Sequence, residues 1–120
     1  MTPAQARLAF GEEWFGVFIQ VHNDGSIPAL AATGMTVSDF LGHRYAPVVP
    51  LGRNPYTYLG GLVPGHGTIP GPNSTAAFGP TQGALLLYKI KVFSLENRPF
   101  TLRITSPTNP AAQASAELDV

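Results

Sequence analysis

The sequence predicts an all-β fold, an antiparallel β-sandwich of about seven to eight strands, with a small closed barrel as the alternative. Three observations support this fold class. Short segments alternate apolar and polar residues, as strands with one buried face do. Glycine and proline, 13 and 12 in number, are spread between these segments rather than gathered in a linker. No stretch of useful length has the periodicity of an amphipathic helix.

The first clear strand is expected over 14–22, and it ends at the turn-forming residues 23–25. Its apolar residues alternate along one face: Phe15, Val17, Ile19 and Val21. A second strand is expected over 35–38. The loop 39–43 then predicts a hairpin that leads into a further strand at 44–46.

The longest strand is expected over 82–93. Five apolar residues alternate along its core face: Ala84, Leu86, Tyr88, Ile90 and Val92. A turn or a single helical turn is predicted at 94–99, and apolar alternation resumes over 100–105. Residues 114–120 are expected either to return as a last edge strand or to fray.

The middle of the chain, 47–80, is rich in proline, glycine and asparagine and is expected to be mostly loop. Short strand candidates lie within it at 56–59 and 75–78. No internal repeat divides the sequence. We therefore expect one domain over 1–120, in which 1–11 and 106–113 are irregular.

The composition narrows the function classes. Only 12% of residues are charged, and seven basic residues balance seven acidic ones, so no overall field attracts nucleic acid or an anionic membrane surface. The chain has no cysteine, which excludes disulfides and a cysteine nucleophile. It has no run of about 18 apolar residues to span a membrane. We expect no signal peptide at its start.

Three stretches together carry a family resemblance. They are the alternating strand and turn at 17–25, the hairpin at 35–45 with its Asp-x-x-Gly-x-x-Tyr pattern, and the loop, long strand and turn at 63–99. These stretches resemble the immunoglobulin-like (telokin-like) extracellular domains of unknown function in bacterial envelope and secreted proteins. The resemblance implies an immunoglobulin-like sandwich and a location outside the cell or in the cell envelope. It supplies no catalytic residues.

No pattern of reactive residues predicts catalysis. The histidines at 22, 43 and 66 are far apart in the sequence and are expected to face solvent rather than to bind a metal. The acidic residues sit in turns or point to opposite faces of a strand, and no serine lies in a Gly-x-Ser-x-Gly elbow. The glycine-rich stretch 60–67 lacks the lysine of a phosphate-binding loop. We therefore expect a protein that is not an enzyme and uses no cofactor or metal.

The outer face of the two long strands is unusually apolar for a sandwich. This apolar face, together with aromatic residues of the loops, predicts a candidate partner surface. Its residues are Trp14, Phe18, Tyr56, Tyr58, Leu85 and Leu87, and Tyr45 can also contribute. The alternative is that the loop 47–80 or the N-terminal segment folds over this face and buries it.

The leading function prediction is a noncatalytic interaction module of the bacterial cell envelope or extracellular space, with a protein partner or self-association. The alternative is a structural subunit of a larger assembly, such as a capsid, tail or filament component. A hydrolase with a site at the rim of the sandwich is the third and least supported reading.

Overall fold

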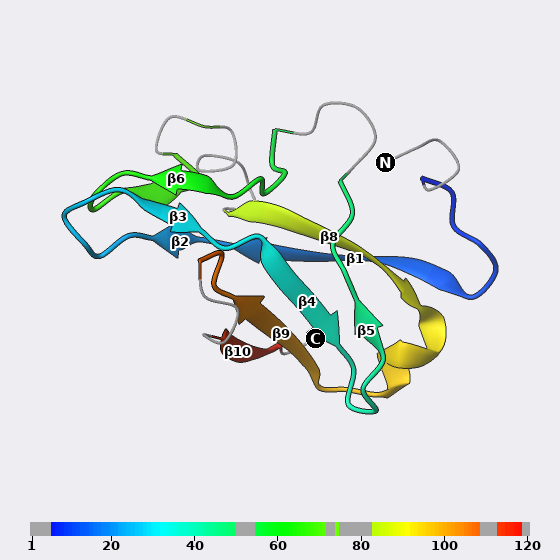
Figure 1. Cartoon of the computed structure of the whole chain (residues 1–120). Helices are drawn as coiled ribbons and strands as arrows, with labels where there is room; N and C mark the ends of the chain where they lie inside the picture. Colours follow the sequence, from blue (N-terminus) through cyan, green and yellow to red (C-terminus); the bar gives the residue numbers. More distant parts are fainter. Residues whose placement is uncertain (1–5, 50–54, 72–73, 75–82, 109–112, 119–120) are drawn as a thin grey trace.

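The chain folds into antiparallel strands and one short 3-10 helix in a computed structural model, which describes residues 6–49, 55–71, 74, 83–108 and 113–118 (Figure 1). The elements in chain order are β1 (Glu12–Ile19), β2 (Val21–His22), β3 (Ala29–Ala31), β4 (Gly34–Ser38), β5 (Arg44–Tyr45), β6 (Gly61–Val63), β7 (Thr68–Ile69), β8 (Ala84–Lys91), η1 (Val92–Glu96), β9 (Phe100–Thr105) and β10 (Gln113–Leu118).

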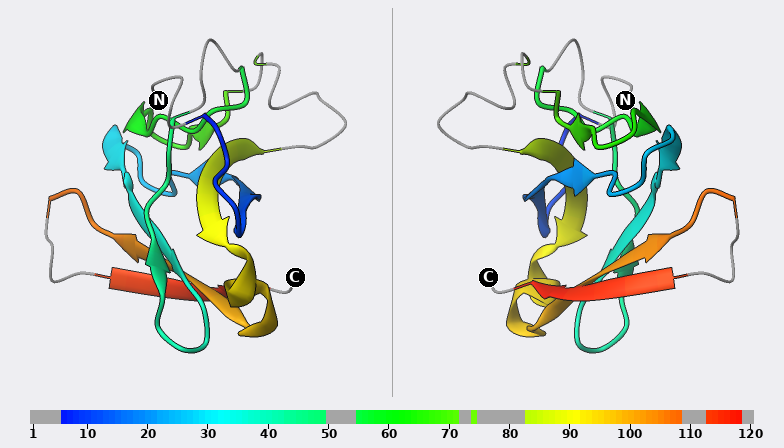
Figure 2. Two further views of the ribbon diagram at one scale, coloured as in Figure 1. Left: turned by 90° about the vertical axis from the view of Figure 1, so that its right-hand side faces the viewer. Right: turned by 90° about the vertical axis from the view of Figure 1, so that its left-hand side faces the viewer.

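Two layers form the sandwich that the sequence predicts (Figure 2). One layer contains β1 and β8, which pair antiparallel over their whole lengths. The other has the strand order β10-β9-β4-β5, again with antiparallel neighbours. The described strands do not close into a barrel, so the alternative fold is wrong.

Two small ribbons, β2–β7 and β3–β6, extend the sandwich at one end and account for strands beyond the predicted seven to eight. Only Ala32 and Thr33 separate β3 from β4, so one nearly continuous extended segment passes from the β3–β6 ribbon into the four-stranded sheet. These strands have two or three residues each. Such lengths are too short to show a period of two in the sequence.

The hydrophobic core lies between the two layers. On β8 the predicted inward residues from Ala84 to Ile90 are all buried, and on β1 the predicted set packs against them. The facing layer contributes Met35 and Val37 from β4 and Phe100 and Leu102 from β9. The sequence therefore identified the core face of both long strands, because burial on one side imposes the period of two.

The prediction for Val92 is wrong: its side chain is exposed, because β8 ends at Lys91 and the chain turns into η1. The single helical turn expected at 94–99 is present, shifted to begin at residue 92. The strand candidate at 56–59 is reduced to a single bridge between Thr57 and Leu85. The candidate at 75–78 lies outside the described residues.

Candidate functional site

Four of the predicted surface residues share the outer face of the β1–β8 sheet. Phe18 lies directly across from Leu85, and Gly16 lies across from Leu87. Trp14 lies across from Lys89, whose ammonium stands over the indole ring at 5.2 Å from its centroid. The face is therefore apolar along its middle and cationic at one end.

Other segments cover this face only in part. One part of it is therefore exposed as a candidate partner surface, and another part is buried. The Arg7 carbonyl accepts a hydrogen bond from Lys89 Nζ at 2.8 Å, which brings the N-terminal segment over the Trp14 end. Val48 and residues 56–58 instead lie beside β8: the Val48 amide donates to the Leu87 carbonyl at 2.7 Å. Trp14, Leu85 and Leu87 are half-buried, while the Phe18 residue keeps 43% of its surface exposed.

The loop aromatics divide between surface and interior. The Tyr56 ring meets the Phe18 ring edge-on at 6.4 Å between centroids, so it extends the outer apolar face. Tyr58 is only 8% exposed, and its hydroxyl donates to the Ala32 carbonyl. Burial raises the pKa of this phenol. The expectation that Tyr58 belongs to the surface is therefore wrong: it anchors the loop to the segment between β3 and β4.

The outward edge of β8 is occupied. Its odd-numbered residues direct their backbone groups away from β1: the Leu85 carbonyl accepts from Tyr58 at 2.8 Å, and the Lys91 amide donates to the Tyr45 hydroxyl at 3.3 Å. In an antiparallel ladder, the residues opposite such positions also direct their N–H and C=O groups outward. The register assigns this orientation to the even-numbered residues 12 to 18 of β1.

The outward edge of β1 has no strand partner within the described chain. The Glu12 amide donates to the Ala9 carbonyl at 3.1 Å, and the Trp14 amide turns to the Glu13 carboxylate at 3.2 Å. No described residue pairs with the outward groups of Gly16 and Phe18. This edge is a run of backbone donors and acceptors beside exposed aromatic surface.

Burial confirms that the sandwich thins toward this edge. Inward residues of β8 are fully buried, whereas the inward residues of β1, namely Phe15, Val17 and Ile19, are only half-buried. Phe15 packs on Phe100 of β9, with 5.0 Å between the ring centroids. Beyond β9, Ala114 and Ala116 of β10 lie on the core side of the sheet and are nevertheless exposed. The layer that contains β1 therefore ends before it covers β10.

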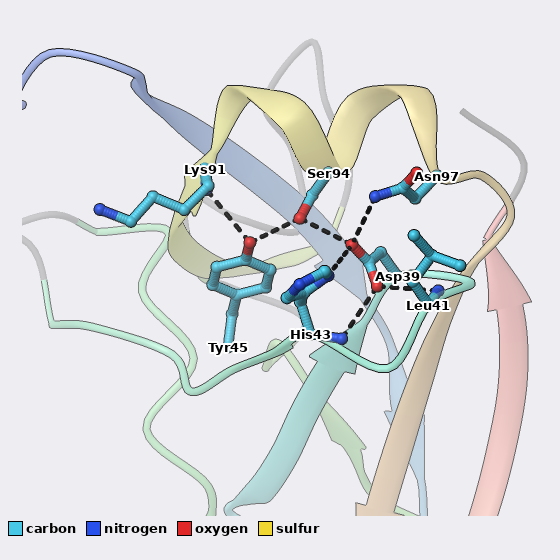
Figure 3. Close-up of polar contacts among 7 residues, drawn as sticks. All are labelled: Asp39, Leu41, His43, Tyr45, Lys91, Ser94 and Asn97. Carbon is cyan, nitrogen blue, oxygen red and sulfur yellow. Dashed lines mark hydrogen bonds and ion pairs between the residues drawn. The ribbon is translucent and has the colours of Figure 1, made fainter.

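A second cluster, centred on Asp39, joins the β4–β5 hairpin to η1 (Figure 3). Asp39 Oδ1 accepts from the amides of Leu41 and His43, at 3.0 and 2.9 Å. Oδ2 accepts from Ser94 Oγ at 2.8 Å, His43 Nδ1 at 2.8 Å and Asn97 Nδ2 at 3.2 Å. Because Ser94 donates its proton to the carboxylate, the Tyr45 hydroxyl is the donor in its 2.5 Å contact with Ser94.

The Asp39 cluster stabilises a buried carboxylate, and its hydrogen bonds differ from those of a catalytic triad. Burial alone raises the pKa of this carboxyl, but the hydrogen bonds from His43, Ser94 and Asn97 outweigh it and hold the pKa well below its usual range. Aspartate, histidine and serine meet here as in a hydrolase, yet both Ser94 and His43 bond to the carboxylate instead of serine to histidine. Ser94 is also 0% exposed, which keeps any substrate away from its oxygen.

Sequence reasoning treated Asp39 only as a turn residue and missed this cluster. The signal was the Asp-x-x-Gly-x-x-Tyr spacing of the hairpin. Its aspartate is the acceptor, its glycine adopts a φ of 93° as the loop turns, and its tyrosine reaches Ser94. The pattern therefore corresponds to a structural connection between the hairpin and η1.

The histidines are exposed, as predicted. His22 contacts Thr68 Oγ1 at 2.9 Å through Nδ1, and its Nε2 lies 3.4 Å from Asp24. The described residues contain no group of three or more His, Cys, Asp or Glu side chains that could hold a metal ion.

Comparisons of the chain with protein-family models, curated proteins and solved structures give no match. Among the described residues, no helix has the length and apolar character needed to cross a membrane.

Proposed function

We propose that this protein is a noncatalytic interaction module that binds a protein through the outer face and open edge of β1. One observation carries the proposal: Phe18 is half-exposed, beside Tyr56 and Leu85, next to backbone groups of the same strand that no described residue pairs with. Aromatic side chains and neutral apolar surface are enriched in protein interfaces. An extended segment of a protein is the ligand that a strand edge binds.

The placement of charge supports the same function. Only 12% of residues are charged, and from Trp14 to Ile19 the strand carries none. A ligand that binds at this edge therefore removes few charged groups from water, and the desolvation cost of binding is small. The family resemblance adds a proposed location in the bacterial cell envelope or extracellular space.

Site-specific photocrosslinking in the source cells tests this function. A benzophenone amino acid at position 18 is expected to give one discrete protein adduct. The same group at Thr101, on the outer face of the other layer, is the control and is expected to give none. The absence of an adduct at position 18, or the same adducts from both positions, would contradict the proposal.

A structural subunit of a larger assembly is the second candidate, and a specific observation favours it. β10 lies at one edge of the four-stranded sheet, with no strand partner beyond it among the described residues, and most of its residues are exposed on both faces. Two open edges per molecule would allow head-to-tail growth through a heterologous contact. Light scattering discriminates the candidates, because growth at two edges gives particles that enlarge with concentration, whereas a single binding edge gives a closed complex.

A further inference from the structure

We propose that the β1 edge binds β1 of a second copy of this chain, antiparallel and around a two-fold axis at Gly16. This inference rests on the proposed function and names the partner. The pairing would join two β1–β8 sheets into one continuous sheet of four strands. The argument uses the direction of the backbone groups, the register that symmetry allows, and the side chains that this register brings together.

The backbone geometry limits the possible registers. A two-fold axis perpendicular to the sheet keeps each face on its own side, so paired residues have the same parity. Outward N–H and C=O groups belong to even-numbered residues, so these residues must pair with even-numbered ones, which an axis at either an even or an odd position allows. Axes at Phe15 and at Gly16 give equal overlap within β1. The axis at Phe15 would pair Glu12 with Phe18 and require the Glu12 amide, which already donates to the Ala9 carbonyl. The axis at Gly16 leaves that bond in place and pairs Trp14 with Phe18 of the second copy. Gly16 and the two Trp14–Phe18 pairs then form roughly six backbone hydrogen bonds.

The Trp14 amide changes its acceptor in this pairing. It now donates to the Glu13 carboxylate at 3.2 Å, a contact in which a side chain occupies an edge position. In the dimer it donates to the Phe18 carbonyl of the second copy, and the Glu13 side chain returns to water. The Glu12 amide keeps its bond to Ala9 at the end of the overlap.

The side chains in this register are complementary. On the outer face Trp14 stands beside Phe18 of the second copy, and on the inner face Phe15 stands beside Val17, where both are now half-buried. Glu12 faces Gln20 and Glu13 faces Ile19 of the second copy, so no like charges are opposed. Gly16, which has no side chain, lies at the axis where the two strands meet.

The edge itself favours a strand over other ligands. Natural sheets protect open edges with lysine, proline, bulges or a covering segment. Residues 13 to 19 contain no lysine or proline, and the ladder with β8 runs through them without a break. A lipid surface would leave the outward N–H and C=O groups of Gly16 and Phe18 without partners, which is costly away from water.

Sedimentation velocity of the purified chain tests the pairing, from micromolar to millimolar concentration. We expect a monomer–dimer equilibrium, and Phe18→Glu should raise the dimer dissociation constant by about tenfold or more. Phe93→Glu is the matched control, because this phenylalanine is 52% exposed on η1 and lies outside β1. It should change the constant by less than about twofold. A strictly monomeric protein, or equal effects of the two substitutions, overturns the proposal.

The register has its own test, because the chain has no cysteine. Trp14→Cys and Phe18→Cys variants are mixed and oxidised at a concentration where the unsubstituted protein is dimeric. Paired Cα atoms about 5.5 Å apart permit a disulfide, so the mixture should give a heterodimer and each variant alone should not. A disulfide from either variant alone at the same yield, or none from the mixture, overturns the register.

These results separate this inference from the proposed function. A monomer in sedimentation that forms an adduct with another protein from position 18 overturns self-pairing and leaves the binding module intact. A dimer that is insensitive to Phe18→Glu, together with no adduct at position 18, overturns both.

Discussion

The two edges of the β1–β8 sheet differ in whether other segments bond to their backbone groups. The β8 edge is closed by Val48 and by residues 56–58, and beyond them Tyr45 bonds to the Lys91 amide. Tyr45 is held in turn by Ser94 and the Asp39 cluster. The β1 edge has aromatic residues on both faces and no strand partner among the described residues.

This difference shows that the domain can cover a strand edge, because it covers the edge of β8. A buried carboxylate with five hydrogen bonds is a demanding structure, because any missing donor leaves charge uncompensated. It fixes the hairpin and η1 beside the closed edge. Among the described residues, the open edge has no comparable stabilising cluster beside it, and only the Glu12 and Trp14 amides find local acceptors there.

Breaking the closed side should have the largest effect. Asp39→Asn places an amide where up to five donors converge, so we expect the free energy of unfolding to fall by about 3 kcal/mol. Urea denaturation measures it. Asp24→Asn is the control, since the Asp24 side chain is 97% exposed and should change stability by less than about 0.5 kcal/mol. A loss at Asp39 no larger than at Asp24 would show that the cluster does not stabilise the closed side.

Acid should weaken the same side. The folded-state pKa of Asp39 lies below that of the unfolded chain, so its contribution to stability is present above about pH 4 and is lost as the pH falls through the folded pKa. The stability difference between the unsubstituted protein and Asp39→Asn should therefore narrow below about pH 4. Denaturation series at several pH values measure it, and a difference that stays constant through this range would contradict the assignment.

The anchor of the loop should have a smaller effect. Tyr58→Phe removes the hydroxyl that donates to the Ala32 carbonyl and leaves the buried ring, so we expect a loss of about 1 kcal/mol in unfolding experiments. Tyr56→Phe is the matched control, because the Tyr56 ring lies at the surface against Phe18 and should lose less. A larger loss of stability from Tyr56→Phe than from Tyr58→Phe would contradict the assignment of Tyr58 as the anchor and Tyr56 as a surface residue.

The smallest effect is expected on β10. Ala116→Glu adds a charge on the core side of the sheet, yet Ala116 is exposed there, so stability should change by less than about 0.5 kcal/mol. Leu102→Glu, at the paired position on β9 where the side chain is buried, is the comparison and should lower stability clearly more than Ala116→Glu. Similar losses at both positions in thermal denaturation would mean that a layer covers β10.

The sequence predicted the parts of the fold that repeat along a strand. Alternation over 84–90 identified the buried face because every second residue meets the same layer. It failed at Val92, where the backbone leaves the strand, and at Tyr58, whose burial depends on a carbonyl 26 residues away.

The Asp39 cluster was beyond such reasoning because Asp39 and Ser94 are 55 residues apart and neither is unusual in its local segment. The open edge was also beyond it. Trp14 and Phe18 suggested an apolar face, but only strand pairing reveals which edge lacks a neighbour.

Hydrogen exchange of single amides in β1 tests the central claim most directly. Val17 lies on the side of the ladder that bonds to β8, so its amide should be protected at every protein concentration. The amides of Gly16 and Phe18 point to the open edge, and their protection should rise as concentration increases and the copies pair. Exchange at Gly16 and Phe18 that is equally fast in dilute and concentrated solution would contradict the account.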